Sequence, residues 1–180
     1  MDCGAYIGDT LQEFIMENKT PAKYFGFEPN PENFKKAQAF LSVTGIEGTM
    51  FNAGVARTSS VMRFSSGNGG GSHIAEDGDL TINTLSLDDT IDELVTLIKM
   101  DVEGSEYDAL KGATFLIGKY KPKLAISIYH KVGDYRKIPL LIKKLNPDYS
   151  DFYIRYLSPK YLYKKDGAGF GFIEVVLFAR

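Results

Sequence analysis

The chain has 180 residues, the length of one ordinary domain, and 44% of them are hydrophobic and 24% charged. Its formal net charge of −2 gives no long-range attraction to nucleic acid or to an anionic membrane. The single cysteine, Cys3, excludes an internal disulfide framework, and the apolar runs are too short to span a bilayer. We therefore expect a cytoplasmic protein with one domain over residues 1–180, which binds neither nucleic acid nor membrane.

Strand-like apolar segments alternate with helical segments along the chain. Apolar periodicity and turn residues predict helices over 9–18, 30–44, 89–94, 106–116 and 139–145. They predict strands over 23–28, 49–55, 61–64, 81–87, 97–101, 124–129, 152–157 and 172–179. This alternation favours an α/β fold, with a mostly parallel sheet, helices on both faces and a C-terminal antiparallel hairpin.

The first four residues resemble the end of a strand. We therefore expect that a segment before the first strand is missing from this chain. An incomplete strand would expose apolar surface, so self-association into a homo-oligomer is a further hypothesis.

The turn after the first strand carries two glycines, Gly4 and Gly8, which allow a tight turn and close approach to a ligand. Tyr6 and Asp9 stand where a pyrophosphate-binding loop has its other glycines. Carboxylates here favour a cation instead, such as the ammonium and sulfonium groups of S-adenosylmethionine. The alternative is an ordinary turn with Asp9 or Thr10 as a helix cap.

Acidic residues follow two other predicted strands. Glu28 lies twenty residues beyond Gly8, the spacing at which a carboxylate meets the ribose hydroxyls of an adenosine ligand. Asp101 and Glu103 follow the strand over 97–101 and would point the same way if strand geometry continued. The alternatives are a solvent-exposed Glu28 and a solvated helix start that includes Glu106.

His130 directly follows the strand over 124–129, at the edge where ligands bind in such sheets. An unperturbed imidazole is largely neutral at physiological pH, so His130 is our candidate general base. The alternative is a surface histidine. With two histidines and one cysteine we expect no zinc cluster and assign no metal ligands, although Asp101 and Glu103 are compatible with magnesium.

Several segments resemble the FkbM family of methyltransferases. The run from Lys99 to Glu106, continuing through 109–113, resembles that family's signature. Residues 2–9 resemble its cofactor turn, 27–31 its ribose-binding strand end, and 84–89 the segment before the signature strand. The resemblance implies a Rossmann-like class I methyltransferase fold, S-adenosylmethionine as the donor, and O-methylation of a sugar or small metabolite.

Two sets of site residues follow from the residue pattern and the resemblance together. The expected catalytic residues are His130, Asp101 and Glu103. The end of the third strand at Asn52 is expected near the adenine, with a plain turn as the alternative. The expected cofactor-binding residues are Asp2, Gly4, Ala5, Tyr6, Gly8, Asp9, Thr10, Glu28, Pro29, Asn30, Asn52, Ala53, Gly54 and Asp101.

Two other functions are compatible with the same pattern. One is a nicotinamide-dependent oxidoreductase on a related fold, which Tyr6 and Asp9 disfavour. The other is a module that binds S-adenosylmethionine without catalysis. For the methyltransferase, the expected partner is a small-molecule or glycan acceptor.

Overall fold

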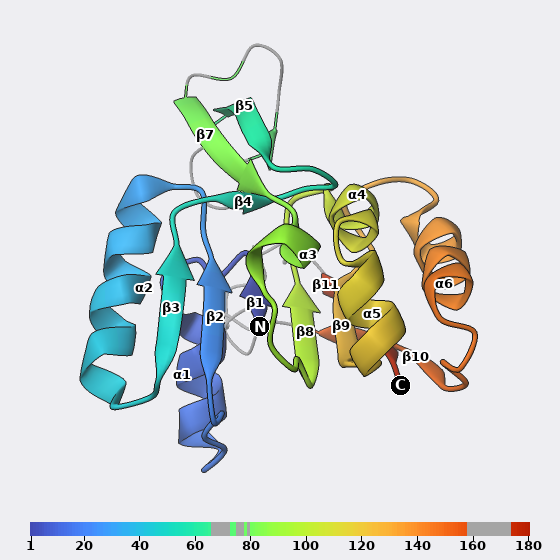
Figure 1. Ribbon diagram of the computed structural model, residues 1–180, viewed down its shortest axis with the longest axis horizontal. Helices are drawn as coiled ribbons and strands as arrows, with labels where there is room; N and C mark the ends of the chain where they lie inside the picture. The colour runs from blue at the N-terminus through green and yellow to red at the C-terminus, as the bar shows by residue number, and fades with distance from the viewer. Residues whose placement is uncertain (66–72, 75–77, 79, 158–173) are drawn as a thin grey trace, which may run out of the picture.

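The computed structural model describes residues 1–65, 73–74, 78, 80–157 and 174–180. A seven-stranded sheet in the order β10-β11-β9-β8-β1-β2-β3 forms its centre (Figure 1). The strands are β1 (Asp2–Cys3), β2 (Tyr24–Phe27), β3 (Gly48–Phe51), β8 (Leu97–Met100), β9 (Lys123–Ser127), β10 (Phe152–Leu157) and β11 (Glu174–Ala179).

The pairing of these strands confirms the predicted fold class. The five strands from β3 through β2, β1 and β8 to β9 are parallel. β10 and β11 form the predicted antiparallel pair, and β11 also pairs antiparallel with β9. The last strand therefore lies inside the sheet rather than at its edge.

Within the described residues, six helices flank the sheet. They are α1 (Asp9–Met16), α2 (Pro31–Thr44), α3 (Leu87–Thr90), α4 (Glu106–Lys111), α5 (Thr114–Tyr120) and α6 (Asp134–Leu145). α2 begins where Asn30 accepts hydrogen bonds from the next turn and Pro31 takes the first helical position.

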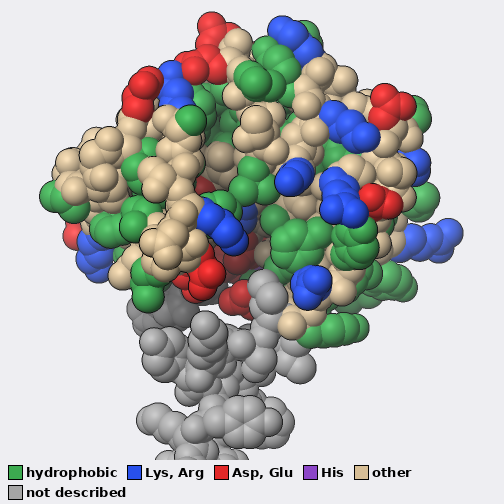
Figure 2. All heavy atoms as spheres, turned by 90° about the horizontal axis from the view of Figure 1, so that it is seen from below, with side chains coloured by type: hydrophobic (Ala, Val, Ile, Leu, Met, Phe, Trp, Pro, Cys, Tyr) green, Lys and Arg blue, Asp and Glu red, His purple; other side chains and the backbone are tan. Residues whose placement is uncertain are grey.

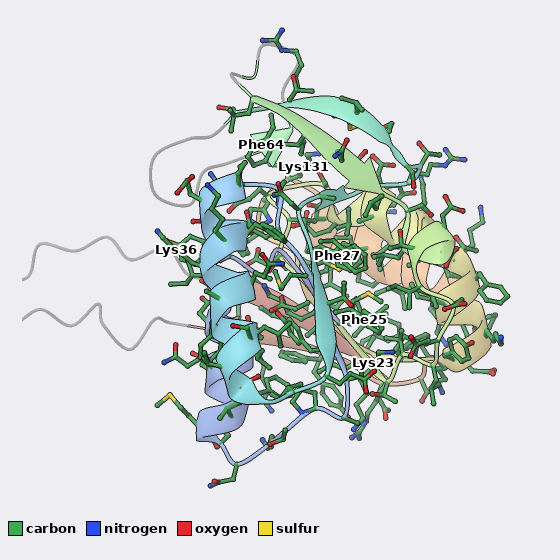
Figure 3. The ribbon with its side chains drawn as sticks, turned by 60° about the vertical axis from the view of Figure 1, so that its left-hand side comes forward. Lys23, Phe25, Phe27, Lys36, Phe64 and Lys131 are labelled. Atoms are coloured by element: carbon green, nitrogen blue, oxygen red, sulfur yellow. The ribbon has the colours of Figure 1, made fainter. Side chains whose placement is uncertain are left out.

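The sheet has a hydrophobic core on each face. α1 and α2 contribute Leu11 and Ala37 to the smaller core, and α3 to α6 contribute to the larger one. Phe25 and Phe27 of β2 belong to the larger core, and Figure 3 shows both rings beyond the sheet from α2. Strands covered on both faces explain the continuous apolar runs in the sequence.

A second, four-stranded sheet, which the sequence did not predict, lies above the carboxyl ends of the parallel strands (Figure 1). Its order is β4-β7-β5-β6, with β4 (Gly54–Val55), β5 (Ser60–Ser65), β6 (His73–Ile74) and β7 (Leu80–Leu85). The predicted strand over 49–55 breaks between β3 and β4. The Asn52 amide donates to the carbonyls of Glu28 and Pro29, which turns the chain out of the first sheet.

Three helix predictions were wrong in detail. The predicted helix over 106–116 is two helices, α4 and α5, and the second continues to Tyr120. α5 starts anew because the Asp88 carboxylate accepts from the amides of Phe115 and Leu116, at 2.8 and 3.0 Å. α3 spans 87–90 rather than 89–94, and α6 begins at Asp134 with Pro139 inside it.

The amino ends of the parallel strands face the opposite side of the molecule. Seen from that side, Lys and Arg side chains alternate with acidic and hydrophobic ones (Figure 2). No helix within the described residues is long and apolar enough to cross a membrane. The glycine-rich segment over 67–72 and the link over 164–171 lie outside the described residues.

Candidate functional site

The turn between β1 and α1 is held against the ends of two neighbouring strands. Gly4 has a φ of 79°, and a Cβ there would lie 1.9 Å from the carbonyl oxygen of Asp101. The amides of Gly4 and Ala5 both donate to the carbonyl of Phe27, at 3.0 Å. Only glycine fits at position 4, so the chain turns closely over the ends of β8 and β2.

The start of α1 differs from the helix-cap alternative. Gly8, with a φ of 90°, is the capping residue, and no side chain caps the helix. Asp9 is the first helical residue and is exposed, and its Oδ1 accepts from the Thr10 amide at 3.0 Å. The Asp9 carboxylate therefore faces solvent beside the turn.

Glu28 is buried at the end of β2, with 6% of its surface exposed. Its Oε2 accepts from the Tyr6 amide and its Oε1 from the Asn30 amide, both at 2.9 Å. Burial raises the pKa of Glu28 to about 7, against the lowering effect of these two hydrogen bonds. The carboxylate ties the β1–α1 turn to the start of α2, which contradicts the solvent-exposed alternative.

Asp2 is buried and already paired. Lys99 Nζ lies 3.0 Å from Asp2 Oδ1, and the Tyr24 hydroxyl donates to Asp2 Oδ2 at 2.9 Å. Lys99 Nζ also donates to the Gly4 carbonyl at 2.6 Å. Burial lowers the pKa of Lys99, but Asp2 and Asp101 raise it above its usual value. Asp2 therefore balances Lys99 beneath the turn. Its expected role in cofactor binding stays a prediction.

The ends of β8 and β9 bring His130 together with three carboxylates. His130 Nδ1 lies 2.8 Å from Glu106 Oε1, while Nε2 lies 3.3 Å from Glu103 Oε2 and 3.5 Å from Asp101 Oδ1. β8 ends at Met100, so continued strand geometry does not explain this convergence. Glu103 and Gly104 adopt φ angles of 54° and 92°, and this turn folds Glu103 back toward the histidine.

Glu106 is a site residue that the sequence analysis missed. Its side chain is fully buried. Glu106 Oε1 accepts hydrogen bonds from the amides of Val102 and Gly104, at 3.0 and 3.3 Å, and also lies 2.8 Å from His130 Nδ1. The alternative of a solvated helix start is therefore wrong for this residue. Ala109 and Leu110, three and four positions on, are fully buried and place Glu106 on the inner face of α4. The apolar residues three and four positions after Glu106 could have indicated this inward placement from the sequence.

The charge state of His130 also differs from the expectation. Burial lowers its pKa, but Glu103, Glu106 and Asp101 raise it to about 10 overall. The expectation of a neutral imidazole at physiological pH is therefore wrong for these surroundings. The three carboxylates therefore favour the protonated imidazole, which counts against His130 as a general base.

The end of the third strand lies beside Glu28. The side-chain amide nitrogen of Asn52 donates to the carbonyls of Glu28 and Pro29, at 3.0 and 3.1 Å. The side-chain oxygen is therefore the atom of Asn52 that could accept a hydrogen bond from a ligand. Ala53 is buried, and Gly54 begins β4. The predicted contacts of these residues with adenine stay a prediction.

Comparisons with known proteins identify the family of this chain. The Methyltransferase FkbM domain family matches residues 2–164. The crystal structure of the methyltransferase FkbM from Methylobacillus flagellatus KT is 28% identical, with a TM-score of 0.76 over 99% of this chain and 42% of that one. The chain thus spans less than half the length of that relative, and a comparison with curated proteins gave no match. Because the family match covers most of the residues, from the β1–α1 turn to beyond β10, the chain belongs to the FkbM methyltransferase domain family.

Proposed function

We propose that this chain is an S-adenosylmethionine-dependent methyltransferase domain that methylates a hydroxyl of a sugar or small metabolite. The observation that carries the proposal is the β1–α1 turn, where Gly4 packs against the end of β8 and Glu28 anchors the amide of Tyr6. Because position 4 has no side chain, the turn lies directly against the end of β8, at the edge where ligands bind in such sheets.

The residues around the turn fit the donor. Glu28 retains unused lone pairs on both carboxylate oxygens, which suit the two ribose hydroxyls. Burial raises the pKa of Glu174, and the nearby carboxylates of Asp101 and Asp9 raise it further. Acids gathered in this way favour a cationic ligand. Lys99, which is paired with Asp2, offsets only part of this negative charge.

Catalysis of methyl transfer depends mainly on how closely the donor and the acceptor are held in line. When bound, S-adenosylmethionine supplies an activated methyl group with a neutral leaving group. The β1–α1 turn and Glu28 hold one reactant, while Asp101 and Glu103, both partly exposed, are placed to orient a hydroxyl. His130 Nε2 lies 3.5 Å from Asp101 and 3.3 Å from Glu103, so the imidazole sits between these carboxylates at the ends of β8 and β9.

Calorimetric titration with S-adenosylmethionine, S-adenosylhomocysteine and NADH tests this proposal. We expect the two adenosyl ligands to bind and NADH to give no heat. Glu28→Ala should weaken adenosyl binding at least ten-fold, whereas Glu32→Ala, on the exposed first turn of α2, should not change it. Circular dichroism of both variants checks that each remains folded.

Binding of NADH alone would contradict the proposal and favour the oxidoreductase alternative. A second assay offers labelled S-adenosylmethionine with a panel of sugars and hydroxylated metabolites. Transfer of label to any of them supports the enzyme, whereas adenosyl binding without transfer across the panel favours the non-catalytic module.

A further inference from the structure

The cluster around His130 has the composition and compactness of a metal site. Asp101, Glu106 and His130 each offer one ligand atom, and these atoms all lie within 4.8 Å of one another. They come from the end of β8, the start of α4 and the end of β9, so three elements converge on one point. Carboxylate oxygens together with an imidazole nitrogen form a ligand set typical of first-row divalent cations.

Two buried atoms of this cluster have no hydrogen-bond partner. They are Glu106 Oε2 and His130 Nε2, on side chains that are 0% and 10% exposed. A buried polar atom without a partner is costly, so two of them in one cluster point to a ligand that binds there. Nε2 lies within 3.5 Å of both Asp101 and Glu103, yet neither contact has hydrogen-bond geometry.

The charges point in the same direction. Three carboxylates, those of Asp101, Glu103 and Glu106, face a single imidazole. Even a protonated His130 would leave an excess of negative charge in a partly buried place. A divalent cation would balance this excess, and Glu106 and His130 each keep one atom without a hydrogen-bond partner that could ligate it.

We propose that Asp101, Glu106 and His130 bind a divalent first-row cation, with Mn²⁺ as its representative, and that Glu103 is an outer carboxylate of this site. The inference rests on the proposed methyltransferase function for its purpose. A cation at the carboxyl ends of β8 and β9 would bind the acceptor hydroxyl and lower its pKa, and Glu103, which is one-third exposed, would accept the proton.

Electron paramagnetic resonance of Mn²⁺ tests the site without any activity measurement. Free Mn²⁺ gives a six-line signal that is lost on binding, so titration of the protein reports affinity and stoichiometry. We expect one bound ion for each chain. Asp101→Asn and His130→Gln should each raise the apparent Kd at least ten-fold.

Asp108→Asn is the matched control, because Asp108 is a nearby exposed acid on α4 that pairs with Lys111. Its affinity for Mn²⁺ should equal that of the unchanged chain. Equal affinity in Asp101→Asn, His130→Gln and Asp108→Asn would overturn the inference, as would the absence of a bound ion in the unchanged chain. Near-ultraviolet circular dichroism of each variant identifies any that fails to fold, and for such a variant Glu103→Gln, with an expected smaller loss of affinity, takes its place.

The same samples, titrated with S-adenosylmethionine in the presence of a chelator, separate this inference from the proposed function. Adenosyl binding without Mn²⁺ binding would overturn the cation site and leave the methyltransferase proposal intact. Mn²⁺ binding that depends on Asp101 and His130, without adenosyl binding, would support the site and count against the proposed function.

Discussion

Gly4 determines how closely the β1–α1 turn packs on β8. We expect Gly4→Ala to destabilise the protein and to abolish adenosyl binding, because the new Cβ would clash with the backbone oxygen of Asp101. Gly45→Ala is the matched control, since Gly45 also has a positive φ, of 72°, but nothing lies within 4 Å of its Cβ position. A positive φ alone costs alanine about 1–2 kcal/mol. Urea unfolding should show a clearly larger loss for Gly4→Ala, and equal losses would contradict this account.

Glu28 makes stability depend on pH. Its pKa is about 7 in the folded protein and near 4.5 when exposed, so the folded state binds more protons between these values. Stability should therefore fall as pH rises from about 4.5 to 7, by on the order of 3 kcal/mol at roughly 1.4 kcal/mol for each pKa unit.

Urea midpoints at pH 5 and pH 8 measure this effect. Glu28→Gln should remove most of the fall, because the amide does not ionise, while Glu32→Gln on the exposed face of α2 should retain it. The same fall in Glu28→Gln and the unchanged chain would assign it to another group.

The candidate site residues that could be predicted from the sequence are those that directly follow strands. Glu28, Asp101 and His130 were predicted because position after a strand places a side chain at the ligand-binding edge. Lys99 was not singled out, since its pairing with Asp2 joins residues far apart in the chain. The predicted charge state of His130 was wrong for the same reason, because its pKa depends on carboxylates from other segments of the chain.

At the scale of elements, the break between α4 and α5 is set by packing on another segment. A Cβ at Gly112 would lie 2.2 Å from the carbonyl oxygen of Ala56. Gly112→Ala should therefore destabilise the protein by more than 1 kcal/mol, although alanine favours helix.

Gly118→Ala is the matched comparison within α5. The nearest atom to its Cβ position is the Leu145 carbonyl oxygen at 3.9 Å, so this variant should gain up to about 1 kcal/mol from helix propensity. Thermal unfolding of both variants checks the pair, and a stabilised Gly112→Ala would show that the junction can relax.

Local periodicity predicted most elements but not their breaks. The parallel strands and the terminal hairpin carry apolar runs that any reading of the sequence finds. The separation of β3 from β4 depends on the Asn52 amide reaching the carbonyls of Glu28 and Pro29, and the second sheet depends on pairing between distant strands. Such non-local contacts leave little trace in a single sequence.

At the scale of the whole molecule, β11 is the strand on which one half of the sheet depends. It pairs with β9 on one side and β10 on the other, and its Leu177 and Ala179 are buried in the larger core. A chain that ends at residue 173 should lose its cooperative unfolding transition and associate through the open strand edges.

Urea unfolding and size-exclusion chromatography of the shortened chain measure both effects. Arg180→Ala, which removes an exposed ion pair with Asp151 and a hydrogen bond to the Tyr153 hydroxyl but leaves β11 in place, is the control and should remain cooperative. A shortened chain that unfolds at the same midpoint as the full one would contradict the structural importance of β11.

Both β1 and β11 are interior strands of the seven-stranded sheet. Both edges of β1 are covered only when the distant β8 has paired with it, and β9 and β10 stay unjoined until β11 lies between them. The sheet therefore closes only through pairings between distant segments, and its partly built form exposes strand edges to other chains. A fold that places His130 and its carboxylates at the junction of β8 and β9 thus gains a finished site only after these distant pairings have formed.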